Sequence, residues 1–345
     1  MISTRPVGGL DYPRTFQEFR VWFPDESCCL DYLERLRWPD GFMCPVCGGG
    51  DGWRTARRLW MCAGCGRKTS PTAGTIFHRS HTPLSTWFAA AWFVTSQKNG
   101  VSARGLQQAL GFGSYETAWA WLHKLRRAMI RPDRDRLHGV VELDETFLGG
   151  VSPGHFGAGT DKVPVQVAVE RVGSRRLGRV RFAVASRPGT LELVEFACTA
   201  IEPGSVIRTD GARMLRRLAD RGYTHEYSTV YNSLDKAEEL PGVHRVAALL
   251  KRWIAGTLHY SVSDQHLAYY LDEYAFRFNR RSPSARGMLF YRLLQQAVAT
   301  ELNARPGGTG RCRVRSSARA ASDNLCPVGH FVESALSLWR FRHAR

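Results

Sequence analysis

The stretch that decides the fold is Gly139-Val140-Val141-Glu142-Leu143-Asp144, a run that is typical of a buried β-strand and ends in a carboxylate. A second run of the same kind, Ser205-Val206-Ile207-Arg208-Thr209-Asp210, precedes Gly211. A carboxylate at a strand end lies at the edge of a core, where burying it unpaired is costly. Two of them indicate a divalent cation, because Mg²⁺ prefers oxygen ligands. A single aspartate is more often an N-cap or a surface ion pair, so Asp144 and Asp210 need support from the rest of the chain.

Strands and helices alternate around these two runs. We expect strands at 139–144, 164–170, 179–185 and 205–209, and helices near 190–200, 211–221, 243–254 and 264–279. This order describes an α/β domain with a mixed sheet and helices on its faces. We place the domain at residues 137–298, after the charged linker 131–136. The glycine-rich run 149–159 lacks the Lys-Ser/Thr that a phosphate loop requires.

The composition indicates a folded protein with a polyanionic partner. The chain has 345 residues, of which 43% are hydrophobic, which is enough for two or three domains. Its formal net charge of +17 favours nucleic acid, with a membrane surface as the alternative. The sequence contains no apolar run of about 18 residues and no apolar signal segment, so we expect a cytoplasmic protein without a membrane partner.

Four of the nine cysteines occur in two closely spaced pairs. Cys44 and Cys47 are followed, after fourteen residues, by Cys62 and Cys65. Each CxxC turn directs two thiolates to one point, and four thiolates satisfy tetrahedral Zn²⁺. We therefore predict one structural zinc ion in a zinc ribbon at residues 44–70, preceded by a helical lead-in at residues 1–43. Four unrelated thiols or a redox dithiol fit two matched pairs less well.

Residues 80–131 show helical periodicity interrupted by a glycine-containing turn. Helices are expected at 103–110 and 115–130, separated by Gly111-Phe112-Gly113-Ser114. The later part of the second helix is basic, with Lys124, Arg126 and Arg127. A helix-turn-helix-like DNA-binding module has this arrangement, with the second helix as the expected DNA reader. A small helical bundle with a basic solvated face fits the same pattern equally well.

A helix that begins near Pro241-Gly242 carries a candidate third ligand. His244 lies away from the apolar stripe of this helix, and Lys251 follows two turns later on the same side. His244 would complete a metal site, and Lys251 would contact the DNA backbone. A lone histidine on a helix is more often a structural hydrogen bonder.

Together these motifs resemble bacterial insertion-sequence transposases of the branch that joins an amino-terminal zinc ribbon to a ribonuclease H-like DDE domain. The similarity rests on both CxxC pairs and on four further segments, which are Leu143-Asp144-Glu145-Thr146, Lys162-Val163-Pro164-Val165, Thr209-Asp210-Gly211 and the stretch from His244 to Arg281. It covers roughly residues 15–300, and the combination is far more specific than any one motif.

The resemblance implies a DDE-type transposase, which cuts double-stranded DNA at the inverted repeats of an insertion sequence and joins it to target DNA. The metal, Mg²⁺ or Mn²⁺, would then be held by Asp144, Asp210 and His244. Two such ions clamp the attacking and leaving oxygens of the phosphodiester. Histidine stands where DDE enzymes in general have glutamate, and this softer ligand favours Mn²⁺. The carboxylates that would otherwise fill the third position are Glu142, Glu238, Glu239 and Glu273.

The resemblance also implies partners and a location. We expect four basic residues to hold DNA phosphates, namely Lys251, Arg252, Arg280 and Arg281. Two DNA ends held together imply a homo-oligomer, at least a dimer, associated with the bacterial nucleoid. Residues 299–345 have no counterpart in the family pattern and are expected to form an atypical basic tail, disordered or bound to DNA. Two other functions fit the same residues: a catalytically inactive zinc-ribbon regulator, and a metal-dependent nuclease or resolvase without strand transfer.

Overall fold

The computed structural model describes residues 5–131, 134–149, 162–173, 175–227, 240–258, 264–282 and 286–300. These residues all belong to one compact unit, which spans Met1–Thr309. The expectations for the glycine-rich run and for the tail fall almost entirely outside the described residues, and so do Glu238 and Glu239.

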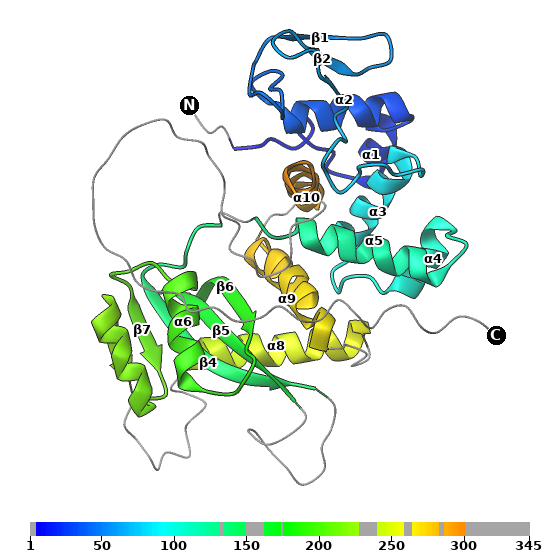
Figure 1. The fold of residues 1–345 in the computed structure, drawn as a ribbon. Helices are drawn as coiled ribbons and strands as arrows, with labels where there is room; N and C mark the ends of the chain where they lie inside the picture. Colours follow the sequence, from blue (N-terminus) through cyan, green and yellow to red (C-terminus); the bar gives the residue numbers. More distant parts are fainter. Residues whose placement is uncertain are drawn as a thin grey trace, which may run out of the picture. The chain divides into compact units, whose positions relative to one another are not determined.

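A five-stranded mixed sheet forms the centre of the α/β domain (Figure 1). Its order is β6 (Arg176–Val184), β5 (Val163–Val172), β4 (Val140–Leu148), β7 (Val206–Thr209) and β8 (Thr224–Tyr227). The first three strands pair antiparallel, whereas β4, β7 and β8 run parallel. The predicted mixed sheet is confirmed, and β8 is a strand that the sequence pattern did not indicate.

Strand β4 continues beyond Asp144. The predicted strand ended at this carboxylate, but β4 runs on to Leu148 because β5 pairs with it along its whole length. Pairing with β7 stops earlier, where Glu142 lies opposite Arg208. Asp144 therefore lies in the middle of a strand, at the level where the neighbouring strand β7 ends.

Helices cover both faces of this sheet. They are α6 (Thr190–Ala200), the 3-10 helix η1 (Arg213–Arg221), α8 (Pro241–Leu258) and α9 (Asp264–Asn279). α6 and η1 pack in one core with Leu143, whereas α8 and α9 pack in another core with Val167. Because neighbouring residues of a strand point to opposite faces, Asp144 lies on the same face as its cross-strand neighbour Val167, the face that α8 covers.

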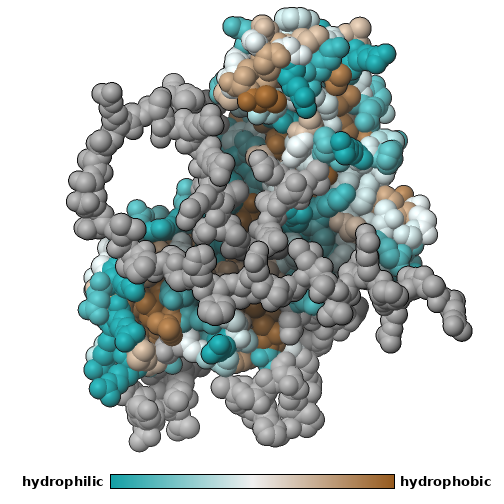
Figure 2. Space-filling model, viewed as in Figure 1, coloured by the Kyte–Doolittle hydropathy of each residue, from teal (hydrophilic) through white to brown (hydrophobic). Residues whose placement is uncertain are grey.

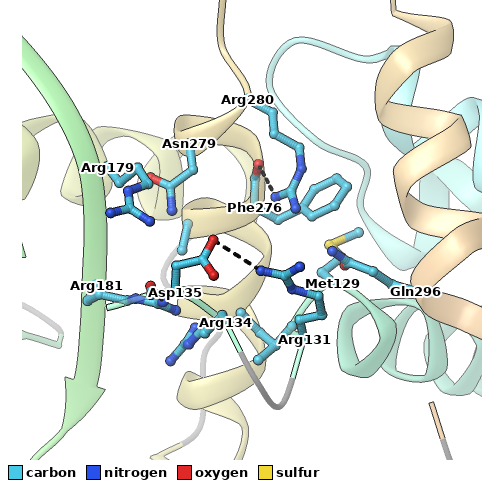
Figure 3. Close-up of a pocket in the computed structure, with 12 residues that line it drawn as sticks. Met129, Arg131, Arg134, Asp135, Arg179, Arg181, Phe276, Asn279, Arg280 and Gln296 are labelled. Atoms are coloured by element: carbon cyan, nitrogen blue, oxygen red, sulfur yellow. Dashed lines mark hydrogen bonds and ion pairs between the residues drawn. The ribbon is translucent and has the colours of Figure 1, made fainter. Parts of the chain in front are cut away.

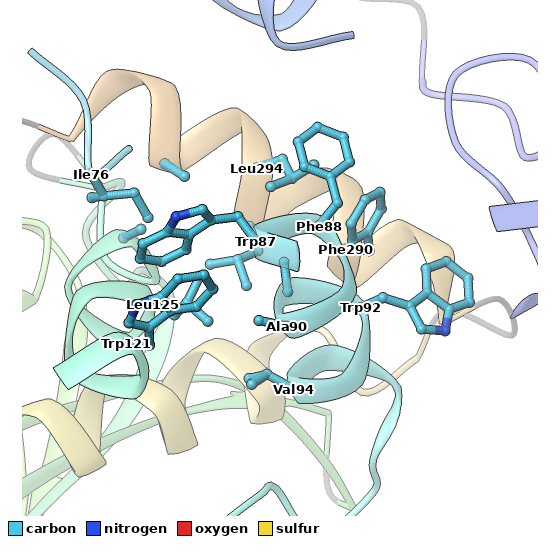
Figure 4. Close-up of a cluster of buried hydrophobic side chains, with 14 of the residues drawn as sticks. Ile76, Trp87, Phe88, Ala90, Trp92, Val94, Trp121, Leu125, Phe290 and Leu294 are labelled. Carbon is cyan, nitrogen blue, oxygen red and sulfur yellow. The ribbon is translucent and has the colours of Figure 1, made fainter. Parts of the chain in front are cut away.

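The remaining helices form a separate, aromatic core (Figure 4). They are α1 (Phe16–Trp22), α2 (Glu26–Arg37), α3 (Leu84–Ser96), α4 (Ala103–Leu110), α5 (Tyr115–Ala128) and α10 (Gly287–Ala299). Trp87 of α3 stacks on Trp121 of α5 with ring centroids 3.5 Å apart. Phe290 of α10 packs edge-on against Phe88. Thus α10, which was predicted within the α/β domain at 137–298, contributes its apolar side chains to the helical core instead.

The helical pair α4 and α5 agrees with the prediction, and local hydrogen bonds explain it. The hydroxyl oxygens of Ser102 and Ser114 accept hydrogen bonds from backbone N–H groups in the first turns of α4 and α5. Gly111 ends α4 with a φ of 67°, a conformation that favours glycine. The interactions that define this turn are therefore local, because they involve only the two caps and the glycine.

A buried ion network joins α5 to α9. Glu273 is 1% exposed, and its carboxylate accepts hydrogen bonds from Arg126 Nε at 2.8 Å and from Arg277 Nη2 at 2.7 Å. Arg277 also donates to the backbone oxygens of Val94 and Gln97 at the end of α3. Burial raises the pKa of Glu273, but Arg277 and Arg126 outweigh burial and hold the pKa below its usual range. The network ties the helical module to the α/β domain.

Replacing Glu273 with Gln should lower the free energy of unfolding by about 3–5 kcal/mol, because it leaves buried guanidinium groups without their counter-charge. The control is Glu226→Gln, which removes a carboxylate from an exposed pair with Arg208 and should cost at most about 1 kcal/mol. Denaturant unfolding measures both variants. Equal unfolding midpoints would show that the buried network contributes no more than a surface pair.

On the face seen in Figure 2, the coloured residues include large hydrophilic areas with smaller hydrophobic areas between them. Among the helices of the described residues, none has the length and hydropathy that crossing a membrane requires.

Candidate functional site

The four predicted zinc ligands converge. The Sγ atoms of Cys44, Cys47, Cys62 and Cys65 all lie within 4.8 Å of one another, with Cys44 3.6 Å from Cys65 and Cys47 3.5 Å from Cys62. Thiolates about 2.3 Å from a tetrahedral zinc ion are about 3.8 Å apart, so the observed spacing fits Zn²⁺. Backbone N–H groups of Cys47 and Val46 lower the pKa of the Cys44 thiol, whereas the neighbouring cysteines raise the pKa of Cys65, as expected where close thiols compete for one negative charge.

A small sheet and the helix before it support these cysteines. The sheet consists of β1 (Gly52–Arg54), β2 (Trp60–Cys62) and β3 (Lys68–Thr69), all antiparallel. Its Trp60 ring stacks on Phe42 with centroids 4.8 Å apart. Arg54 forms ion pairs with Asp31 at 2.6 Å and Glu34 at 2.9 Å on α2. Helix α2, predicted as part of a separate lead-in, is therefore bound to the ribbon.

Asp144 and Asp210 lie on neighbouring strands at the same level. Glu142 is opposite Arg208, so continuing this parallel register by two residues places Asp144 beside Asp210, which directly follows β7. Burial raises the pKa of Asp144, and the charge of Asp210 raises it further. The Glu145 N–H group and the charge of His244 act in the opposite direction. Tertiary packing thus brings the three predicted ligands within electrostatic reach of one another.

Glu142 holds α8, and with it His244, against the sheet. This side chain is 2% exposed, and its Oε2 accepts a hydrogen bond from Val243 N at 2.9 Å in the first turn of α8. Its Oε1 lies 3.2 Å from Arg171 Nη1. Both carboxylate oxygens are therefore engaged, and Glu142 supports the site rather than replacing His244. Glu273 is likewise committed to its ion network, so neither of these two carboxylates is available as a substitute ligand.

The donor set of the aspartates and His244 suits a divalent cation. Among the described residues, only the four cysteines form a cluster of three or more Cys, His, Asp or Glu side chains that is compact enough to share one ion. In a two-metal site the ligand atoms do not all have to converge on one ion, because the two ions lie about 4 Å apart and the ligands are divided between them. Asp144 is half-buried, whereas Asp210 and His244 are exposed and can adjust. The two carboxylates are typical ligands of Mg²⁺ or Mn²⁺, whereas the imidazole is a softer ligand that favours Mn²⁺ of the two.

Comparison with known families identifies both parts of this arrangement. Residues 136–279 match the ISXO2-like transposase domain, and residues 24–68 match the transposase zinc-ribbon domain. The chain belongs to the transposase family that joins a zinc ribbon to a DDE domain. The zinc-ribbon match begins ahead of α2, in agreement with the contacts of Arg54. No curated protein matches the chain at a significant level.

Two lysines from different elements lie near each other. Burial lowers the pKa of Lys251, and the nearby charge of Lys162 lowers it further. Lys251 follows His244 by two turns of α8, and Lys162 directly precedes β5. Lys162 belongs to a motif of the sequence, but no spacing indicated that it lies near Lys251. Neither lysine acts on Asp144, so the pair lies away from the aspartates.

Arg126 does not face solvent. It is 2% exposed, it is bonded to Glu273, and its guanidinium lies 4.3 Å from the centre of the Tyr270 ring. A DNA phosphate cannot reach this group, so the prediction that Arg126 contacts DNA is wrong. Sequence periodicity placed it on the solvated side, but α9 covers that side of α5.

The other basic residues in the later half of α5 are partly covered. Lys124 is half-buried, with Nζ 5.7 Å from the centre of the Trp87 ring, and Arg127 is also half-buried. The exposed residues of α5 are at its beginning, namely Tyr115, Glu116 and Thr117. The basic face of this helix is therefore less solvated than either interpretation of the sequence expected.

The remaining basic residues divide between two cavities. Arg252 is exposed and lines a cavity of about 600 Å³ together with Lys98, Arg281 and Arg286. Arg281 lies 4.1 Å over the Phe278 ring and donates to backbone carbonyls, including that of Leu177 in β6. Arg280 is half-buried and lies in a different cavity, described below.

Zinc removal should unfold the ribbon, because metal binding and local folding are one event in such a small domain. The double change Cys44→Ser with Cys62→Ser should abolish bound zinc, measured by elemental analysis, and lower the melting temperature. Cys198→Ser, a half-buried thiol on α6, is the matched control and should keep one zinc ion per chain. Zinc content that is unaffected by the double change would rule out the four-cysteine site.

Proposed function

We propose that the chain is an active DNA transposase, which cuts DNA at the ends of an insertion sequence and transfers the freed strand to target DNA. The observation that carries this proposal is the environment of Asp144, a half-buried carboxylate on which both Asp210 and His244 act electrostatically. A half-buried carboxylate that is repelled by a second one, as Asp144 is by Asp210, gains stability from a bound cation. Such an arrangement is costly in a merely structural role, so it favours a catalytic metal site.

The residues of the chain position the ligands. β4 and β7 set Asp144 beside Asp210, and Glu142 anchors the helix that carries His244. Mg²⁺ or Mn²⁺ held by these three side chains would supply the positive charge that polarises the scissile phosphodiester. Water is the first nucleophile, and the 3′-hydroxyl that it frees is the second, so no protein side chain has to form a covalent intermediate.

A line of cations leads away from the site along α8. Lys162 and Lys251 are its first members, and Arg252 is about 12 Å from His244 along the helix axis. Beyond it lies the cavity that Arg252 shares with Lys98 and other cations, and no carboxylate is among the described residues that line this cavity. Arg277, which also lines this cavity, is paired with Glu273, but the excess of positive charge favours a DNA backbone, which it would hold in line with the site.

The helix-turn-helix-like module is proposed to contact DNA with the start of α5. In such motifs the amino-terminal residues of the second helix contact base edges. Tyr115, Glu116 and Thr117 occupy this position and are exposed, unlike the basic residues later in α5. Because two element ends have to be held together, we propose that the active form is at least a dimer on DNA.

Asp144→Asn and Asp210→Asn should each reduce cleavage and strand transfer by more than about 100-fold, since loss of even an indirect partner of a metal ligand costs about 10- to 100-fold. Binding to the element ends should remain. The assay uses DNA carrying the inverted repeats that flank the gene, with Mg²⁺ or Mn²⁺. Asp220→Asn, which changes an exposed aspartate on η1, is the control and should stay active.

Two results would contradict this assignment. Full activity of either aspartate variant would place the metal site elsewhere. Unaltered protein that binds the ends but cuts nothing with either metal would instead identify a DNA-binding regulator.

Substitution of His244 tests the third ligand. His244→Ala should lose most of the activity with Mn²⁺, whereas His244→Glu should keep part of it with Mg²⁺, because carboxylate oxygen suits this harder ion. His81→Ala, at an exposed histidine ahead of α3, controls for a general effect of losing an imidazole. A fully active His244→Ala protein would reduce His244 to a structural helix residue.

A further inference from the structure

A cavity of about 240 Å³ lies where the helical module meets the α/β domain (Figure 3). Its lining comes from the connector after α5 and from β6, α9 and α10. Five of the lining residues are arginines, namely Arg131, Arg134, Arg179, Arg181 and Arg280. We refer to this cavity as the arginine pocket. Apart from Arg280, none of these arginines was predicted to have a role.

The described carboxylates around the pocket do not balance this charge. Asp135 pairs with Arg131 at 3.3 Å, and Glu170 pairs with Arg179 at 2.6 Å. The third carboxylate is that of Asp272, whose pKa is raised to about 7 by burial, although nearby arginines oppose the shift. The charge of Glu202 also acts on Arg179, so four carboxylates, one of them with a raised pKa, face five guanidinium groups. Unbalanced charge in a partly buried place is unfavourable unless a counter-ion joins it.

The arginines also repel one another. Burial lowers the pKa of Arg181 to about 9, and the charges of Arg134 and Arg179 lower it further. Burial lowers the pKa of Arg280 to about 10, and Arg292 and Arg131 add to this effect. The network of Glu273 differs, because there a carboxylate lies between the two arginines. The pocket therefore has the electrostatics of an anion site rather than of a completed ion network.

The walls of the pocket are held in place before any anion binds. Arg280 lies 4.3 Å over the Phe276 ring, and its Nη2 donates at 3.0 Å to the amide oxygen of Gln296 when that amide is oriented to donate to the carbonyls at the end of α5. The Asn279 side chain accepts from Val180 N at 2.7 Å and donates to the carbonyl of the same residue at 3.0 Å. Preorganised guanidinium groups bind phosphate strongly, because their N–H donors match its oxygens.

A second cavity of about 610 Å³ adjoins the arginine pocket. It shares Asp135 and Arg179 with the pocket and adds Arg136, His138, Glu202 and Pro203. Two arginines and two carboxylates balance one another in this second lining. The excess of positive charge therefore belongs to the arginine pocket itself, where one oxyanion is enough.

We propose that the arginine pocket binds a phosphate group, and that this phosphate belongs to the backbone of bound DNA. The second part rests on the proposed transposase function, whereas phosphate binding itself does not. A phosphate in the pocket would join the connector after α5 to β6 and α9, so that DNA binding would tighten the contact between the helical module and the catalytic domain.

Two measurements on the full chain separate a free phosphate from a DNA phosphate. The first compares melting temperatures in inorganic phosphate and in chloride at equal ionic strength, because a ligand of the native state raises stability. The second measures affinity for short duplex DNA of random sequence as a function of salt. Arg134→Gln tests the pocket, and Arg131→Gln, a more exposed member, replaces it where Arg134→Gln fails to fold. Arg14→Gln is the control, since it removes an exposed arginine paired with Glu18.

A DNA phosphate predicts that the pocket variant lowers the salt slope of DNA binding by about 0.9, the contribution of one phosphate contact, whereas the control keeps the original slope. Loss of the phosphate-specific stabilisation without a change in DNA binding supports the pocket but assigns it to a free oxyanion. Pocket variants that match the control in both measurements would overturn the proposal. Protein that cuts no DNA yet shows these differences would refute the proposed function and leave the pocket intact.

Discussion

The candidate active site depends on the buried carboxylate of Glu142. One of its oxygens accepts the N–H of Val243, and the other is paired with Arg171. A carboxylate at the start of a helix also interacts favourably with the helix dipole. This contact joins β4 to α8 directly beneath the predicted ligands. Asp144 lies two residues beyond Glu142 in β4, and His244 lies one residue beyond Val243 in α8. The contact between Glu142 and Val243 therefore fixes the position of Asp144 relative to His244.

Basic residues have different roles in different parts of the molecule. The role depends on whether a carboxylate is paired with the basic residue. Arg126 and Arg277 enclose Glu273 and act as a buried joint between helices. Lys162 and Lys251 instead repel each other, as the lowered pKa of Lys251 indicates. The net charge of +17 is therefore not a uniform DNA-binding surface. In the arginine pocket the described arginines outnumber the described carboxylates that act on them, although some of them, such as Arg131 and Arg179, are paired.

The two cores of the molecule are linked by elements that are far apart in the chain. α10 completes the core formed by α2, α3 and α5, and α9 contacts both α5 and the sheet. The helical module is consequently not an independent domain placed ahead of the α/β domain. The Glu273 network and the connector that lines the arginine pocket are links between the two parts.

The sequence by itself determined the features that depend on short-range chemistry. The two CxxC pairs, the serine caps of α4 and α5, and the strands around Asp144 and Asp210 are local patterns of spacing, hydrogen bonding and periodicity. Only the tertiary structure decided which charged residues are buried. Arg126 is buried because α9 covers it. Lys162 lies near Lys251 although the two are far apart in the sequence. Glu142 anchors α8 because this helix packs on β4. Contacts between residues that are distant in the sequence produce no periodic pattern in it, so only the folded chain shows them.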